Sequence, residues 1–490
     1  MKGTGLTMNK VITRDFVSNG FVFTDIRSGK KYDKAALVDK IDYWKYVLKH
    51  KYQAQRQESI LIGMQRLGLD YFAIIIAAAE LALKIVVVDY NRTDKFRDLE
   101  YNDPKTRLLA PIDIFLHDLT QETLDSNLSA CAKYFFFTKH SKRTYCTLDA
   151  EDISIDPQSK AEVSPIRPQE TDVLFRVTSS GTTDVPKVIE HTHEFIYSVS
   201  IRNSSLYHGT AVHVNNLNHG ASASVTLLPL LANDNIDNHL FFDCADYETV
   251  EYLVDNLSPY KDVIGYLSFA YPFLIDRFIE CSRAKDIKWS KLDLITLSYI
   301  LDSAKQAVRD GVFNSITSIF GSNETLGPVF INKSTRDEWN IDSRNFVPYD
   351  DFYKIRLTDE KQIVITVPVY NKEVITNDYF DQVGKHFVHC GRSDMFRING
   401  EAVNLSTINE LNKKNTDTYV VVDTLNHCLY LACWKYMTAL EIQTIKEEVE
   451  GHFERIKIAK VLNLDKSNFY YGIKIDNELL REHFRTYNVS

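Results

Sequence analysis

The sequence has few of the features that mark secreted or disulfide-stabilised proteins. Its seven cysteines are an odd number and show no Cys-x-x-Cys spacing, which argues against a disulfide framework and against a zinc site. Residues 1–9 contain no apolar run, and we therefore expect no secretory signal. Scattered cysteines are typical of reduced thiols, which favours a cytoplasmic protein.

Long apolar runs, internal repeats and basic clusters are also missing. The most apolar stretch, residues 72–88, is interrupted by Glu80 and Lys84, whereas a membrane span needs about 20 apolar residues with few charges. A buried helix followed by a buried strand fits this stretch better. The formal net charge is -9 and no lysine–arginine block occurs, so nothing indicates a nucleic-acid-binding surface.

The composition is that of a globular protein. The 490 residues are 44% hydrophobic and 25% charged, which is enough chain for two or more domains. Residues 22–51 predict a short strand, a turn and a helix. We then predict a strand over Ser59–Gly63, a helix over Tyr71–Leu83 and a strand over Ile85–Asp89. This order with short links is typical of an α/β protein with a parallel sheet.

A hydroxyl-rich loop follows a short apolar run, Val173–Phe175, that predicts a buried strand. Its N–H and O–H groups are donors that bind an anion, and its glycine allows a ligand to approach the backbone closely. Lys187 adds a compact positive charge. The pattern favours a loop around nucleotide phosphates, although the same residue types also form ordinary polar turns. The loop residues are Thr178, Ser179, Ser180, Gly181, Thr182 and Thr183.

This loop is not the P-loop, because neither Gly29-Lys30 nor Gly384-Lys385 has the upstream glycine and the following hydroxyl of that motif. With His191-Thr192-His193 behind it, the loop resembles the signature of the ANL superfamily of adenylate-forming enzymes, which includes acyl-CoA synthetases, peptide-synthetase adenylation domains and luciferases. Asp184 stands where that family usually has glycine. The two histidines are structural in the family; the alternative is that both face one side of a strand as metal ligands.

A second motif, Phe320-Gly321-Ser322-Asn323-Glu324, resembles the aromatic-Gly-x-Thr-Glu segment of the same family. A carboxylate is the natural ligand of the hard cation that accompanies ATP, so Glu324 is the candidate Mg²⁺ ligand. Asn323 replaces the usual threonine and keeps a polar side chain near the nucleotide. The alternative is a surface glutamate in a turn after a strand.

Two further motifs resemble the ribose-binding and hinge segments of the family. Thr376-Asn377-Asp378 resembles Thr-Gly-Asp, and a fixed carboxylate at Asp378 suits the two hydroxyls of a ribose. The sequence Gly391-Arg392-Ser393-Asp394 resembles Gly-Arg-x-Asp. The resemblance gives Arg392 a contact with the ribose and makes Asp394 the hinge between two domains.

The closing segment of the chain, residues 472–481, resembles the family motif that carries a catalytic lysine. Lys474 would neutralise charge as a carboxylate oxygen attacks the α-phosphate. The resemblance also implies that His219, Gly220 and the small residues after them, among them Ser222, shape the acyl pocket. The adenine segment departs from the family, because residues 298–303 include a tyrosine and branched side chains where glycines usually leave an open ledge.

The order of these motifs implies an α/β fold with a large multi-sheet N-terminal domain for ATP and the acyl group, residues 1–390. A small mobile α+β domain, residues 391–490, would follow. The implied activity is ATP-dependent conversion of a small carboxylic acid to an acyl-adenylate, with transfer to a thiol. Lys187, Glu324 and Lys474 would be catalytic, the cofactors ATP and Mg²⁺, and the acceptor CoA or a phosphopantetheinyl carrier protein.

Two alternatives remain open. Asp184 and the altered adenine segment are also consistent with a degenerate relative that binds a nucleotide or an acyl ligand without turnover. The other alternative is an adenylating ligase whose acceptor is an amine.

Overall fold

Contacts divide the chain into two compact units, Met1–Asp351 and Phe352–Ser490, each described separately below. The boundary that the sequence predicts after Cys390 stays a prediction. The computed structural model describes residues 9–26, 28–63, 67–87, 113–117, 144–146, 166–178, 188–215, 222–242, 249–269, 272–297, 299–392, 395–398, 401–404, 408–409, 411–412, 417–423, 428–451, 456–471, 474–475 and 477–486.

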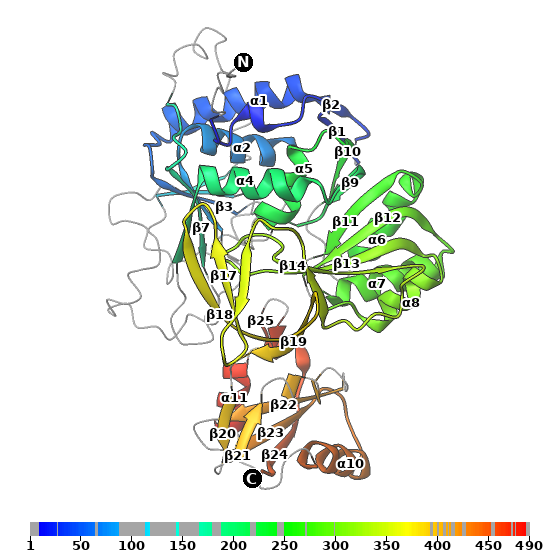
Figure 1. The fold of residues 1–490 in the computed structure, drawn as a ribbon. Helices are drawn as coiled ribbons and strands as arrows, with labels where there is room; N and C mark the ends of the chain where they lie inside the picture. The colour runs from blue at the N-terminus through cyan, green and yellow to red at the C-terminus, as the bar shows by residue number, and fades with distance from the viewer. Residues whose placement is uncertain are drawn as a thin grey trace. The chain divides into compact units, whose positions relative to one another are not determined.

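The first unit contains a sheet with the strand order β6-β5-β3-β4-β7-β8, of which β3 and β7 are labelled in Figure 1. All neighbours are parallel except β7 and β8, which form an antiparallel pair. The strands predicted at residues 59–63, 85–89 and 173–175 are confirmed as β3, β4 and β7, with β4 described as far as Val87. The bounds are β3 Ser59–Gly63, β4 Lys84–Val87, β5 Ile114–His117, β6 Thr144–Cys146, β7 Val173–Thr178 and β8 Val188–Thr192.

A second sheet of this unit has the order β15-β14-β13-β12-β11-β9-β10-β1-β2. Its strands β1, β10, β9, β11, β12 and β13 are parallel to one another, and β2, β14 and β15 join antiparallel. The bounds are β1 Val22–Asp25, β2 Lys31–Asp33, β9 Gly209–His213, β10 Ile236–Phe241, β11 Ile264–Phe269, β12 Trp289–Thr296, β13 Phe313–Phe320, β14 Phe330–Thr335 and β15 Asn345–Pro348.

Helices cover the sheets of the first unit. Trp289 of β12 stacks on Phe278 with 5.3 Å between ring centroids, in a core that also contains residues of α6 and α8. The turn predicted before the first helix is present, with Gly29 at a φ of 68°, a value that glycine adopts without strain. The bounds are α1 Lys34–Tyr46, α2 Leu69–Glu80, α4 His193–Ser204, α5 Leu228–Leu231, α6 Thr249–Leu257, α7 Pro272–Ala284 and α8 Asp302–Arg309.

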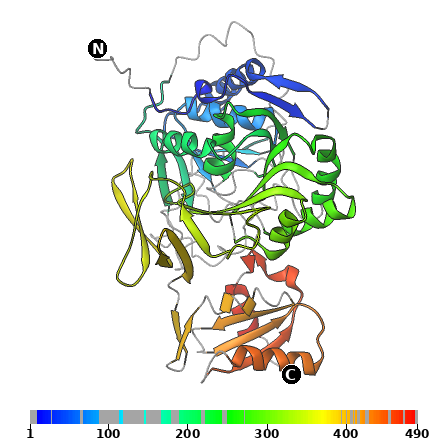
Figure 2. The same ribbon diagram turned by 45° about the vertical axis from the view of Figure 1, so that its right-hand side comes forward.

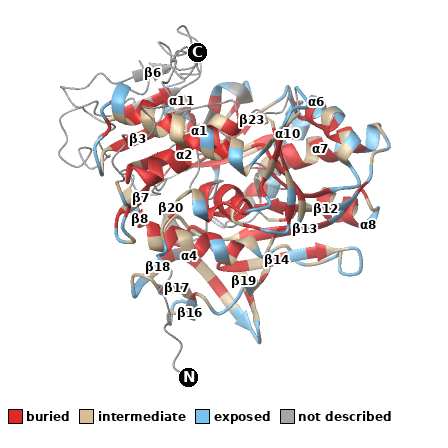
Figure 3. Ribbon diagram, turned by 90° about the horizontal axis from the view of Figure 1, so that it is seen from above, coloured by how far each residue is buried: buried red, intermediate tan, exposed pale blue. Residues whose placement is uncertain are grey.

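The most apolar stretch of the sequence forms the buried helix α2 and the strand β4 (Figure 3). Its charged residue Glu80 is 6% exposed and accepts hydrogen bonds from the side chains of Arg14 and Lys45 at 2.7–2.8 Å. Burial opposes ionisation of Glu80, but these hydrogen bonds outweigh it and lower the pKa of the carboxyl to about 2. In the part of the chain that is described, no helix has the length and apolar character needed to cross a membrane.

The second unit begins with the strand order β16-β17-β18-β19, in which neighbours are antiparallel. A three-stranded sheet, β22-β23-β24, packs with α10 and α11 (Figure 1; Figure 2, orange to red). The bounds are β16 Lys354–Leu357, β17 Gln362–Val367, β18 Lys372–Val383, β19 His386–Arg392, β20 Met395–Ile398, β21 Glu401–Asn404, β22 Thr418–Asp423, β23 Cys428–Cys433, α10 Ala439–Glu450, β24 Ile458–Asn463, β25 Tyr470–Tyr471, β26 Lys474–Ile475 and α11 Asn477–Thr486.

A buried ion pair ties α11 to this three-stranded sheet. Asp423, at the end of β22, is fully buried and accepts two hydrogen bonds from Arg485, at 2.9 and 2.6 Å. The hydroxyl of Tyr430 donates a third hydrogen bond at 3.0 Å. A buried carboxylate needs such donors, because an unpaired charge is strongly unfavourable away from water.

Candidate functional site

The predicted site segments of the first unit follow the carboxyl ends of parallel strands. The hydroxyl-rich loop follows β7, and the segment with His219 and Gly220 follows β9. The adenine segment follows β12, and the turn with Glu324 follows β13. Because β9, β11, β12 and β13 are neighbours, three of these segments start from one edge of one sheet. Ligands of open α/β sheets bind at this edge.

The predicted phosphate loop connects the two strands of a hairpin. Thr178, the last residue of β7, pairs with Val188, the first residue of β8. Ser179–Thr183 and Lys187 lie outside the described residues, as does the side chain of Thr178. The hairpin itself is fixed by Arg176, which donates to Glu190 across the two strands at 2.7 Å and to Ser59 of β3 at 3.0 Å. The two ends of the loop are therefore held by a well-bonded sheet.

The turn that carries Glu324 is tightly bonded. The hydroxyl of the fully buried Thr325 accepts from the N–H of Ser322 at 2.9 Å and donates to the carbonyl of Ser322 at 3.1 Å. Gly321 has no room for a side chain, because a Cβ there would collide with the carbonyl oxygen of Gly327. Asn323 and Glu324 are half-buried at the tip of this turn. The backbone therefore fixes the position from which Glu324 projects.

His191 joins this turn to the strand that leaves the phosphate loop. Its Nε2 lies 2.8 Å from the carbonyl oxygen of Asn323, which can only accept, so Nε2 carries the proton. The ring is 1% exposed and stacks on Phe195, with 4.9 Å between centroids. Burial lowers the pKa of His191 to about 4, so the ring is neutral at pH 7. The Glu324 turn is thus anchored to β8.

His193 has a different environment, so the two histidines do not form one metal site. It is the first residue of α4, after the N-cap Thr192, and its Nδ1 accepts from the N–H of Ile12 at 3.1 Å. Burial lowers the pKa of His193 to about 4 as well. The alternative in which both histidines face one side of a strand is wrong, because β8 ends at Thr192 and His193 belongs to α4. The hydrogen bonds of both residues agree with a structural role.

The predicted acyl-pocket segment is only partly within the described residues. His219 and Gly220 lie outside them, and Ser222, whose side chain is not described, begins a π-helical segment over Ser222–Leu227. Residues 223–227 are buried, and the hydroxyl of Tyr207 donates to the carbonyl of Val225. Asn215, two residues beyond β9, donates to the carbonyl of Ser268 in β11 at 2.8 Å. This bond joins the carboxyl ends of the two strands beside the segment.

The predicted adenine segment is fixed by core packing and by a hydrogen bond from Ser343. Ile300 is 2% exposed and belongs to the core between β12 and the outer helices, and its carbonyl accepts from Ser343 at 2.7 Å. The ring of Tyr299 lies 6.4 Å from that of Phe346. Ser298 lies outside the described residues. Ile300 therefore packs in the core, and the ring of Tyr299 lies beside that of Phe346.

In the second unit, the structure brings the two predicted ribose residues together. Asp378 of β18 stands directly opposite Arg392 of β19 in the antiparallel register, although the Arg392 side chain is not described. The carboxylate of Asp378 accepts from Nε2 of His389 at 3.1 Å. Sequence reasoning missed His389, because a β-bulge changes which strand residues face Asp378.

The last two predicted residues are only partly placed. Lys474 is the first residue of β26 and pairs with Tyr471 of β25, but its side chain is not described. Asp394 lies outside the described residues. The catalytic and hinge roles of these two residues stay predictions.

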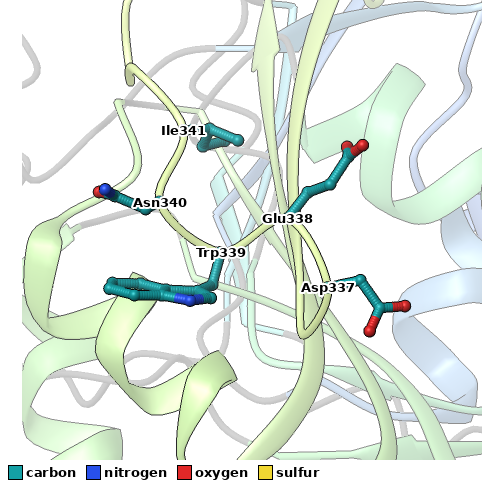
Figure 4. Close-up of a pocket in the computed structure, with 5 residues that line it drawn as sticks. All are labelled: Asp337, Glu338, Trp339, Asn340 and Ile341. Atoms are coloured by element: carbon teal, nitrogen blue, oxygen red, sulfur yellow. The ribbon is translucent and has the colours of Figure 1, made fainter.

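A pocket of about 340 Å³ lies elsewhere in the first unit (Figure 4). Its lining comes from one loop, residues 337–341, between β14 and β15. Thr335, just before the loop, pairs with Ser315 near the amino end of β13, and Arg309 lies over the ring of Trp339 at 4.8 Å. The pocket therefore lies at the opposite edge of the sheet from Glu324, and we do not assign it to the acyl group.

Comparison with known proteins gives matches at the level of structure. No protein-family model matches the sequence, and no curated protein does. A structure described as fatty acyl-adenylate ligases from E. coli and L. pneumophila matches with a TM-score of 0.72 and 14% identity, covering 98% of this chain and 99% of that one. O-succinylbenzoate coenzyme A synthetase from Bacillus subtilis, with ATP and a magnesium ion, matches with a TM-score of 0.68 and 13% identity, covering 97% of each chain.

A third similar structure is McyG A-PCP with phenylalanyl-adenylate, with a TM-score of 0.69 and 14% identity, covering 97% of this chain and 95% of that one. Matches over nearly the whole length of both chains establish the architecture, while identities this low establish the fold alone. The chain shares the α/β fold of these structures over nearly its whole length, and the predicted fold class is confirmed.

Proposed function

We propose that this protein activates a carboxylic acid with ATP. A carboxylate oxygen attacks the α-phosphorus, the acid becomes an acyl-adenylate, and pyrophosphate leaves. A thiol then attacks the acyl carbon, a thioester forms, and AMP leaves with the oxygen that came from the acid. The described ligands of two similar structures, phenylalanyl-adenylate and ATP with magnesium, are consistent with this chemistry.

One observation carries the proposal. The strand that leaves the hydroxyl-rich loop is bonded through His191 to the turn that carries Glu324, at 2.8 Å from the Asn323 carbonyl. A loop rich in N–H and O–H donors suits phosphates, and a carboxylate suits the cation that accompanies them. The contact joins the strand that follows the loop to the turn of Glu324, and this supports a shared role of the two segments at a triphosphate and its cation.

We assign the ATP contacts as the motifs predict. The loop residues Thr178–Thr183 and Lys187 would bind the phosphates, and Glu324 would hold Mg²⁺, with Asn323 beside the nucleotide. In the second unit Asp378 and Arg392 would bind the ribose, and their opposed positions in the β18–β19 register support a shared ligand. The half-buried carboxylate of Glu324 fits a hard cation.

The remaining assignments concern the acid and its transfer. Lys474 would neutralise the charge that develops as the carboxylate attacks ATP. His219, Gly220 and Ser222 would border the acyl group. The second half-reaction would follow a rotation about Asp394 of the domain formed by residues 391–490, with CoA or a carrier-protein thiol as the acceptor.

A cytoplasmic location is part of this proposal. Four cysteines with described side chains are free thiols, which is the state that a reducing compartment maintains. They are Cys281, Cys390, Cys428 and Cys433.

The test is ATP–pyrophosphate exchange, in which labelled pyrophosphate enters ATP only when a suitable acid is present. A panel of aliphatic, aromatic and amino acids is screened, guided by the mass of any acyl-adenylate that copurifies. We expect Lys474→Ala to abolish the exchange. Lys457→Ala is the matched control, because Lys457 of the same unit is 68% exposed and pairs with Glu450 at 3.2 Å. Equal loss in both variants would contradict the assignment of Lys474.

The altered adenine segment supports the second candidate function, binding without turnover. Ile300 is committed to the core where the family has an open glycine ledge, which changes the surface available to adenine. ATP binding by calorimetry without exchange for any acid would favour this binder. Product analysis with CoA, a carrier protein and amines then distinguishes a thiol acceptor from an amine.

A further inference from the structure

We propose that His389 is a positioning residue that orients the carboxylate of Asp378 for recognition of the two ribose hydroxyls of ATP. The inference rests on the proposed function, because it concerns the nucleotide of that reaction. His389 acts through Asp378 and makes no contact with the ligand itself.

The His389–Asp378 pair is well shielded from water. Nε2 of His389 lies 3.1 Å from Oδ1 of Asp378, and the side chains are 11% and 12% exposed. An ionised carboxylate only accepts, so the imidazole nitrogen is the donor. A polar group this far from water needs a hydrogen-bond partner, and that partner also holds it in one orientation. His389 therefore fixes the rotation of the carboxylate that would meet the ribose.

A β-bulge explains how His389 comes to face Asp378. In the β18–β19 pair, Tyr379 is opposite Gly391 but Phe380 is opposite His389, so Cys390 is the extra residue. In a regular ladder Cys390 would be opposite Phe380, and His389 would lie on the other face. The Sγ of Cys390 instead contacts Asp381, at 3.3 Å from Oδ2, on that other face. Bulges commonly turn a side chain towards a site in this way.

Packing holds the imidazole in place on the Asp378 face. The rings of Phe380 and His389 are 4.9 Å apart between centroids, and Phe380 is fully buried. Within β18, the N–H of Asp378 donates to the hydroxyl of Thr376 at 3.2 Å. The ring is thus restrained by an aromatic neighbour, and the carboxylate is oriented before any ligand arrives. Such preorganisation improves the binding of a vicinal diol, because less conformational freedom is lost on binding.

The experiment compares ATP with 2′,3′-dideoxy-ATP in wild type, His389→Phe and His389→Gln. Phenylalanine keeps the ring and its packing but has no donor, whereas glutamine restores an N–H near the position of Nε2. The assay is acid-dependent pyrophosphate exchange. We expect His389→Phe to raise the KM for ATP about tenfold or more with kcat nearly unchanged, and we expect His389→Gln to recover most of the affinity for ATP.

The decisive readout is the preference for ATP over the dideoxy analogue. A residue that acts through the ribose hydroxyls should lose most of this preference in His389→Phe, since the analogue lacks the groups that Asp378 would hold. If His389 had only a structural role, its substitution would weaken the binding of ATP and of the dideoxy analogue equally. His386→Phe, the same change at the start of β19, is the matched control and should keep the preference.

The outcomes separate the two proposals. A wild type with acid-dependent exchange and an unchanged nucleotide preference in His389→Phe overturns the role of His389 and leaves the adenylation intact. A wild type that binds neither ATP nor AMP overturns the proposed function, and the role of His389 with it. Thermal unfolding of each variant shows whether a lost preference comes from misfolding. If His389→Phe is misfolded, the nucleotide preference of His389→Gln tests the role of His389 instead.

Discussion

The link between His191 and the Glu324 turn can be tested by His191→Phe. Phenylalanine preserves the aromatic ring that stacks on Phe195 at 4.9 Å, but it removes the N–H that reaches the Asn323 carbonyl at 2.8 Å. The ring is 1% exposed, so water cannot readily replace the lost donor. We expect the free energy of unfolding to fall by about 1–3 kcal/mol, the usual effect of removing one partner of a buried hydrogen bond.

His191→Phe should also weaken the binding of the cation, by an amount comparable to its effect on stability. If Glu324 holds Mg²⁺, His191 acts one step behind the ligand and fixes the turn that presents it. Loss of such outer partners typically weakens metal binding about 10- to 100-fold. The assay is pyrophosphate exchange titrated with Mg²⁺ at saturating ATP and acid. We expect the Mg²⁺ concentration for half-maximal activity to rise at least about tenfold.

His193→Phe is the matched control for this prediction. His193 is also buried and neutral, but it accepts from Ile12 and has no bond to the Glu324 turn. We expect this variant to lose stability while its Mg²⁺ dependence stays that of the wild type. The reasoning is refuted if His191→Phe is folded and active with the Mg²⁺ dependence of His193→Phe.

Three further predictions concern stability. The folded-state pKa values of His191 and His193, about 4 each, lie below the usual 6.5, so below pH 6.5 the unfolded chain binds protons that the folded chain excludes. We expect each ring to reduce stability by about 1.4 kcal/mol per pH unit as the pH falls from 6.5 to 4, measured by urea unfolding; a flat profile would contradict this. Arg485→Met leaves the buried Asp423 without its main partner and should cost about 3–5 kcal/mol, seen as a selective loss of hydrogen-exchange protection in β22–β24. Gly321→Ala forces a Cβ against backbone and should lower the midpoint of thermal unfolding and abolish exchange, whereas a wild-type midpoint would refute the steric argument.

Local patterns predict the elements of the first unit well. The strand expected over Ser59–Gly63 is β3, and the apolar run at Val173–Phe175 begins β7, because continuous apolar residues suit strands buried on both faces. The helix expected over Tyr71–Leu83 runs over Leu69–Glu80 instead. The helix ends earlier because Ala82 takes a φ of 52°, which is not a helical value. Alanine favours helices, so the sequence does not predict a break at this position.

Contacts between distant residues could not be predicted in the same way. His191 and Asn323 are 132 positions apart, and no local pattern pairs them. The charge of Glu80 by itself indicates that its helix does not span a membrane, but it does not indicate the partner, Arg14, which lies 66 positions away. The resemblance to family motifs identifies the site segments along the chain. Which of these segments contact one another is determined by the fold.

The second unit shows a different limit. The motifs predict that Asp378 and Arg392 both lie at the ribose, and their opposed positions in the β18–β19 register agree with a common role. His389 escaped notice because strict alternation along β19 would have placed it on the other face. One extra residue, Cys390, reverses that pattern, and nothing in its side chain marks it as a bulge.

The most direct measurement of the central claim follows the oxygen atoms of the acid. The protein is incubated with ATP, Mg²⁺, a thiol acceptor and its carboxylic acid substrate, which carries heavy oxygen in the carboxylate. The masses of the products are then measured by mass spectrometry. We predict AMP that carries one heavy oxygen, together with unlabelled pyrophosphate. Label in inorganic phosphate with release of ADP, or AMP without label, would contradict attack by the acid on the α-phosphorus.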